Sequence, residues 1–131
     1  MELHLSIVGY LLITLALMHV PFPRYFNWEK ELASLNLLLR QMMKVHTFFI
    51  AFFVLLIGVL CVHSADDILN TKLGHDLALG LFAFWVTRLF FQWFVYSPQL
   101  WTGKPFETVV HVLFSCIWIY FSTVFFLIYW D

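Results

Sequence analysis

Four long apolar stretches make up most of this 131-residue chain and set the strongest constraint on its fold. They cover residues 3–20, 45–62, 77–95 and 109–130, and together they contain one Lys, Arg, Asp or Glu residue. About 20 helical residues at 1.5 Å each cross a hydrocarbon core of roughly 30 Å. The pattern therefore predicts an all-α protein, a four-helix transmembrane bundle in which residues 1–131 form a single integral membrane domain.

The composition agrees with this class. Apolar residues account for 63% of the chain and charged residues for 11%, which lies outside the usual range of a soluble domain. The net charge is −1 and there is no basic run, so nothing indicates a nucleic-acid partner. Glu2, with no Lys or Arg before it, distinguishes the first stretch from a signal peptide and favours a retained helix.

The positive charges between the stretches predict an orientation. One side of the predicted bundle carries all but one of the Lys and Arg residues that lie in connections, namely Arg24, Lys30, Arg40, Lys44 and Lys104. The positive side is expected to be cytoplasmic, so a multi-pass protein with both termini on the non-cytoplasmic side is predicted.

The connections differ in length. Residues 21–44 form the longest one, and Asn27 followed by leucines at helical spacing predicts a short cytoplasmic interfacial helix there. The alternative is that this segment extends the second apolar helix beyond the bilayer. Residues 64–74 indicate a turn, and the link 97–105 holds Trp101, a residue suited to the headgroup layer.

Arg88 lies inside the third apolar stretch and is the strongest functional signal in the chain. An arginine at that depth is costly against lipid, so it is expected to face the protein interior, a wet cavity or a ligand. Gln92 and Tyr96 follow at intervals of four and place a polar stripe on the same helix face. The competing interpretation is a structural arginine that reaches the headgroups or bonds to Gln92.

A second polar face lies on the fourth apolar helix. It comprises residues at intervals of three or four, namely Glu107, His111, Ser115, Trp118 and Ser122, and it is expected to point inward. The spacing of four would let Glu107 orient the imidazole of His111. With His19 and His46 near the same membrane face, these residues predict a cytoplasm-side polar cluster around Arg88 and Gln92.

The leading hypothesis is a non-catalytic membrane protein, either an accessory subunit or a lipid-binding protein. Its ligand-binding residues would be Arg88, Gln92, His46, His111, Glu107, His19 and Tyr96, with an anionic lipid-like ligand or a partner's helix as the occupant. Membrane lipids are the expected partners. A bundle of four helices is thin, so a homo-oligomer or a larger membrane complex is also expected.

Two other classes remain open from the sequence. A single b-type haem ligated by His46 and His111 would make the chain an electron-transfer protein. A small metal-dependent lipid-modifying enzyme would draw its ligands from His19, His46 and His111, although no local spacing links them. The ligand, the catalytic status and the metal are not determined by these patterns.

Overall fold

The computed structural model describes residues 1–96, 98–100 and 102–131. Ser97 and Trp101 lie outside the described residues, and so does the predicted headgroup contact of Trp101. The described part of the chain is all-α. Its elements are α1 (Glu2–Met18), α2 (Phe22–Tyr25), α3 (Trp28–Glu31), α4 (Leu37–His63), α5 (Ala65–Asn70), α6 (Lys72–Phe90), the π-helical η1 (Phe91–Val95), the 3₁₀ turn η2 (Pro98–Leu100) and α7 (Pro105–Trp130).

Three helical segments among the described residues are long and apolar enough to cross a membrane. They are Leu37–His63, Lys72–Val95 and Pro105–Trp130. The first apolar stretch forms α1, which has 17 residues and a length of roughly 25 Å, at the lower end of what spans a bilayer. The transmembrane prediction is thus supported for three of the four stretches by length and composition.

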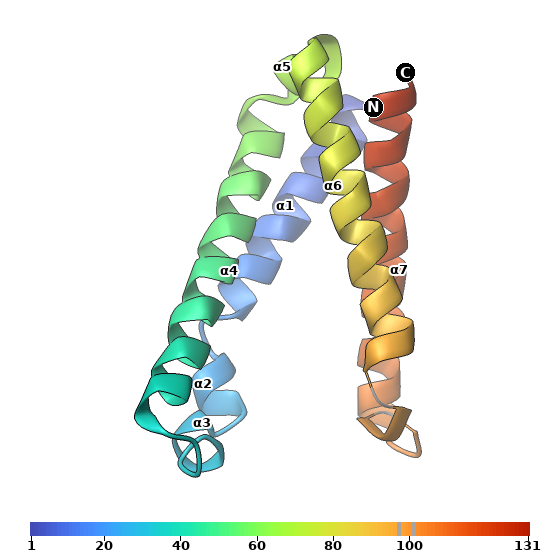
Figure 1. Ribbon diagram of the computed structural model, residues 1–131. Helices are drawn as coiled ribbons and strands as arrows, with labels where there is room; N and C mark the ends of the chain where they lie inside the picture. The colour runs from blue at the N-terminus through green and yellow to red at the C-terminus, as the bar shows by residue number, and fades with distance from the viewer. Residues whose placement is uncertain (97, 101) are drawn as a thin grey trace. The chain divides into compact units, whose positions relative to one another are not determined.

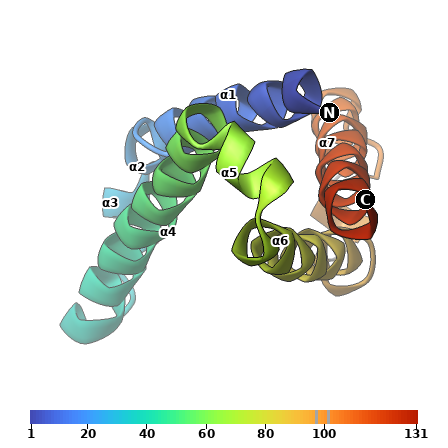
Figure 2. The ribbon, with the colours of Figure 1, turned by 90° about the horizontal axis from the view of Figure 1, so that it is seen from above.

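The described helices form two compact units, residues 2–65 and residues 66–131, the second also taking in Met1. In the first unit α1 packs along α4, and in the second α6 packs along α7 (Figures 1 and 2). Each pair is a helical hairpin with antiparallel helices (Figure 1). The all-α class is confirmed, whereas the closed four-helix bundle, the single domain and the membrane orientation stay predictions.

Two glycines set the contact in the first hairpin. A Cβ atom on Gly9 would lie 2.8 Å from the carbonyl oxygen of Gly58, and a Cβ on Gly58 would lie 2.8 Å from the carbonyl oxygen of Gly9. The backbones of α1 and α4 therefore meet where neither helix has a side chain, as is common for membrane helices. Leu5, Val8 and Leu12 on the same face of α1 are fully buried.

The connection between α1 and α4 differs from the predicted interfacial helix. It contains two single-turn helices, α2 and α3, and then a break before α4 begins at Leu37. Asn27 precedes α3 but adopts a left-handed conformation with φ of 53° and makes no side-chain cap. The effective cap is Asn36, whose Oδ1 accepts a hydrogen bond from the Leu39 amide at 2.8 Å. The leucines after it thus extend the second apolar helix, which was the alternative.

The predicted turn at residues 64–74 contains a short helix. Residues 65–70 form α5, and Thr71 then caps α6 by accepting a hydrogen bond from the Gly74 amide at 3.0 Å. The imidazole of His75 donates from Nε2 to the Leu69 carbonyl at 2.7 Å and closes the turn. A Cβ on Gly74 would overlap the backbone of Ile68, so this position requires glycine.

Candidate functional site

The helix that carries Arg88 changes from α-helical to π-helical winding a few residues after this arginine. α6 ends at Phe90 and continues as the π-helical segment η1, in which the Tyr96 amide donates to the Phe91 carbonyl at 3.1 Å. Such π turns are rare and occur frequently at functional sites. Gln92 lies within η1 and is 9% exposed, so the altered winding accompanies a buried polar side chain.

Gln92 connects η1 to α7. Its amide Nε2 donates a hydrogen bond to Nδ1 of His111 at 2.8 Å. Because Nδ1 accepts, the proton of the neutral imidazole is on Nε2. The structure thus brings two predicted site residues together, and it gives Nδ1 of His111 an amide partner instead of the expected Glu107 carboxylate.

Arg88 lies between the two helices of the second hairpin. The Cζ atom of its guanidinium is 5.3 Å from the ring centroid of Trp118 on α7 and 5.4 Å from that of Tyr96. Both distances are within the range of cation–π interactions. The side chain is half-buried and lies in the last turn of α6, where the helix dipole also favours a cation.

Aromatic rings support this position of Arg88. Trp85 of α6 stacks on Trp118 with ring centroids 4.9 Å apart and an interplanar angle of 13°. Phe121 meets Trp85 edge to face at 5.0 Å, and Phe114 stacks on Trp118 at 5.6 Å. These rings pack around the indole of Trp118. The guanidinium of Arg88 therefore lies on a closely packed aromatic surface.

A second hydrogen-bond chain runs beside Gln92. The indole Nε1 of Trp93 donates to the Ser115 hydroxyl at 3.0 Å, and this hydroxyl donates to the His111 carbonyl at 2.8 Å. Ser115, Trp118 and Ser122 are all buried, so the predicted face of α7 points inward from Ser115 onward, whereas His111 is half-buried and Glu107 is exposed.

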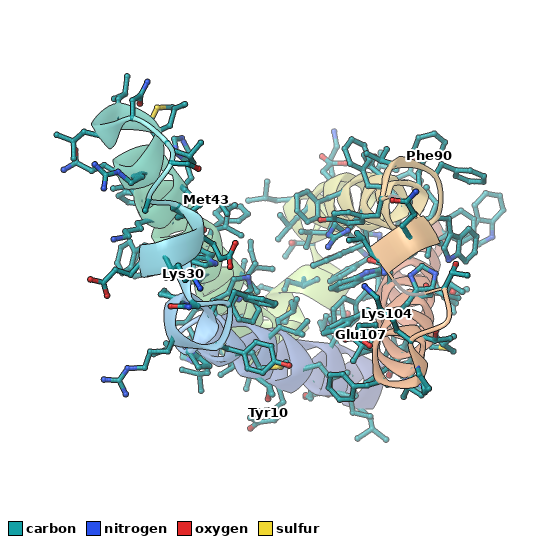
Figure 3. All side chains as sticks on the ribbon, turned by 90° about the horizontal axis from the view of Figure 1, so that it is seen from below. Tyr10, Lys30, Met43, Phe90, Lys104 and Glu107 are labelled. Atoms are coloured by element: carbon teal, nitrogen blue, oxygen red, sulfur yellow. The ribbon has the colours of Figure 1, made fainter. Side chains whose placement is uncertain are left out.

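Glu107 is exposed in the first turn of α7. It lies beside Lys104, the residue that precedes the helix (Figure 3). A carboxylate there interacts favourably with the helix dipole, which gives Glu107 a structural role at the helix start. Its predicted membership of the ligand site stays a prediction.

His19 and His46 lie in the first hairpin. Nδ1 of His19 donates to the Leu15 carbonyl at 2.7 Å and its ring lies 4.8 Å from that of Phe22. Nδ1 of His46 donates to the Met42 carbonyl at 2.8 Å, and this residue is exposed. Each imidazole is thus oriented by its own helix, and the joint cluster with Arg88 stays a prediction.

Within the described ranges, no group of three or more His, Cys, Asp or Glu side chains is arranged to hold a metal ion. Cys61 is buried and Cys116 is exposed, and both are free thiols. The haem hypothesis for His46 and His111 and the metal-dependent enzyme remain untested predictions.

Two buried serines of α7 are expected to respond oppositely to loss of the hydroxyl. The Ser122 hydroxyl has no hydrogen-bond partner among the described residues, whereas Ser115 both accepts and donates. An unsatisfied buried hydroxyl is destabilising, so Ser122→Ala should raise the free energy of unfolding by about 1 kcal/mol and Ser115→Ala should lower it by about 1 kcal/mol. Thermal unfolding in detergent, followed by circular dichroism, measures both. Equal losses would show that Ser122 is hydrogen-bonded.

Comparison of the chain with protein-family models, curated protein sequences and solved structures gives no match.

Sequence reasoning identified Arg88, Gln92, Tyr96 and His111, and the second hairpin holds all four. It missed the π turn and the indole stack of Trp85 on Trp118. The stack has a sequence signal in hindsight, because both tryptophans lie on the faces that carry the polar residues. The π turn has no such signal that we recognise.

Proposed function

We propose that this chain is a non-catalytic membrane protein that binds an anionic, lipid-like ligand at Arg88, with Gln92 and His111 beside it. The observation that carries the proposal is the environment of the guanidinium. Aromatic rings attract a cation but do not neutralise it. No Asp or Glu lies within eleven residues of Arg88 in either direction, so no carboxylate on the adjoining turns of its own helix can pair with the charge.

The neighbouring groups suit an anion. A guanidinium offers five N–H donors in a planar fork that matches a phosphate or carboxylate, and the hydrogen-bonded pair of Gln92 and His111 places further polar groups on η1 and α7. Such charge-assisted hydrogen bonds are stronger than hydrogen bonds between neutral groups. The proposal rests on residues of one hairpin; His19 and His46 carry no part of it.

The test compares lipids that co-purify with the wild type and with Arg88→Gln in mild detergent. A hydrogen-bonded charge contributes about 1.5–3 kcal/mol, so we expect Arg88→Gln to lose anionic phospholipid by about ten-fold or more. Arg88→Lys should retain part of it, since the charge stays but the fork is lost. Quantitative mass spectrometry of extracted lipid per protein measures the change.

Arg24→Gln is the matched control, because Arg24 is an exposed arginine in the connection between α1 and α4. Its lipid content should equal that of the wild type. An Arg88→Gln protein with normal anionic lipid would refute the proposal, and so would equal losses in the two variants. Loss of a co-purifying protein instead of a lipid would favour the accessory-subunit interpretation.

A further inference from the structure

A shallow recess runs along one face of α6 and ends at Arg88. Its volume is about 430 Å³, within the roughly 300–1,000 Å³ typical of small-molecule sites. The lining residues recur at helical spacing and are Gly80, Ala83, Phe84, Thr87, Arg88 and Phe91. Five of them come from α6 and Phe91 comes from η1, so the recess belongs to the second hairpin alone.

The floor and walls of the recess are apolar. Gly80 and Ala83 provide the floor because they have the smallest side chains, and Phe84 and Phe91 provide rings. The Thr87 hydroxyl donates to the Ala83 carbonyl at 2.8 Å, so its hydrogen is used within the helix. The charge in this recess therefore comes from Arg88, at the Phe91 end.

We propose that this recess holds the hydrocarbon chain of the ligand whose anionic headgroup binds Arg88. This inference rests on the proposed function and specifies its ligand class: an amphiphile with a phosphate or carboxylate headgroup and a flexible chain. Charge complementarity selects this occupant over another helix. A helix docking on the small residues Gly80 and Ala83 would gain packing, but it would leave the cation beside it without an anion.

Gly80 offers a clean test because a Cβ atom there meets nothing within 4 Å. Gly80→Leu fills the recess without displacing a neighbour in the hairpin, and it improves helix propensity, so the variant should fold. Val86→Phe is the matched control, since Val86 is exposed on α6 outside the recess and also gains bulk.

The probe is phosphatidic acid with a diazirine in the middle of one acyl chain, reconstituted with the protein in phosphatidylcholine nanodiscs. After irradiation, peptide mass spectrometry maps the cross-links. We expect labelling of residues 80–91 that unlabelled phosphatidic acid competes away. A leucine at position 80 would occupy the space that the acyl chain takes in the recess, so Gly80→Leu should reduce the labelling several-fold. Val86→Phe should leave it unchanged.

The two proposals fail differently. If Arg88→Gln lowers anionic lipid retention while Gly80→Leu leaves the labelling intact, the hydrocarbon chain of the lipid does not lie in the recess. In that case this inference is wrong but the proposed anion site stands. If labelling of residues 80–91 is the same in wild type and Arg88→Gln, the anion site itself is wrong. If Gly80→Leu changes the mass of the detergent-solubilised assembly and not the labelling, the recess is a helix-docking face and the inference is overturned.

Discussion

Gly9→Leu should separate α1 from α4. A Cβ at this position already comes within 2.8 Å of the Gly58 carbonyl oxygen and 2.6 Å of a Val62 methyl group. The methyl can rotate away, but the carbonyl belongs to the backbone of α4 and cannot move without the helix. Overpacking costs about 1–3 kcal/mol, and a leucine at a contact between two backbones is expected at the upper end, about 3 kcal/mol.

Helix propensity makes the sign of this effect informative. Glycine is about 0.8–1.0 kcal/mol less favourable than alanine inside a helix, so propensity alone predicts that a Gly→Ala change stabilises the helix that carries it. Close packing predicts the opposite at Gly9 and Gly58. Gly80→Ala, where the Cβ meets nothing, should show the stabilising effect of propensity alone.

Cys61 reports the separation directly. It is fully buried in the first hairpin, and its Cβ lies 3.2 Å from the position that a Gly9 Cβ would take. A loss of about 3 kcal/mol corresponds to about a 100-fold rise in the open population, and hence in the rate at which a maleimide modifies Cys61 in detergent. Cys116 is exposed and serves as the internal control in the same chain. Unchanged Cys61 reactivity in Gly9→Leu, relative to Cys116, would contradict this packing.

Trp118→Ala is expected to produce the largest loss of stability in the second hairpin. Trp118 is 6% exposed, stacks on Trp85 and on Phe114, and lies under the guanidinium of Arg88. Removing a buried aromatic side chain typically costs about 3–5 kcal/mol. Near-ultraviolet circular dichroism should also lose the signal of the stacked indoles, and thermal unfolding measures the stability.

The controls for Trp118 separate packing from the cation–π contact. Trp130→Ala removes an indole that is 77% exposed and should have little effect. Trp118→Phe keeps a ring beneath Arg88 but a smaller one, so it should cost less than alanine and retain part of the anionic lipid. If Trp118→Ala and Trp130→Ala were equally mild, Trp118 would not be the centre of the α6–α7 contact.

Helix boundaries show where sequence reasoning succeeded and failed. The apolar stretches located the long helices, but α4 begins eight residues before the expected Val45 and α6 begins five residues before Leu77. Apolar composition shows which residues can lie in lipid. A helix begins, however, where a side chain caps its free backbone amides. Asn36 and Thr71 supply those caps, and both positions became apparent only from their hydrogen bonds.

The candidate site was predictable residue by residue but not in its pairings. A charged residue among apolar ones is visible in any sequence, which is why Arg88 stood out, and a spacing of four placed Gln92 and Tyr96 near it. The same spacing suggested Glu107 as the partner of His111. Helical periodicity tells which residues share a face of one helix, but it carries no information about the facing helix, from which Gln92 reaches Nδ1 of His111.

By itself the sequence determined the all-α class, the apolar character of the long helices and the residue types available for a polar site. Those properties follow from local composition and period, because each helix satisfies its own backbone hydrogen bonds. Tertiary structure alone decided that α1 meets α4 at Gly9 and Gly58 and that Arg88 lies over Trp118. Such contacts join residues far apart in the chain, and they depend on which side chains leave room for a neighbouring helix.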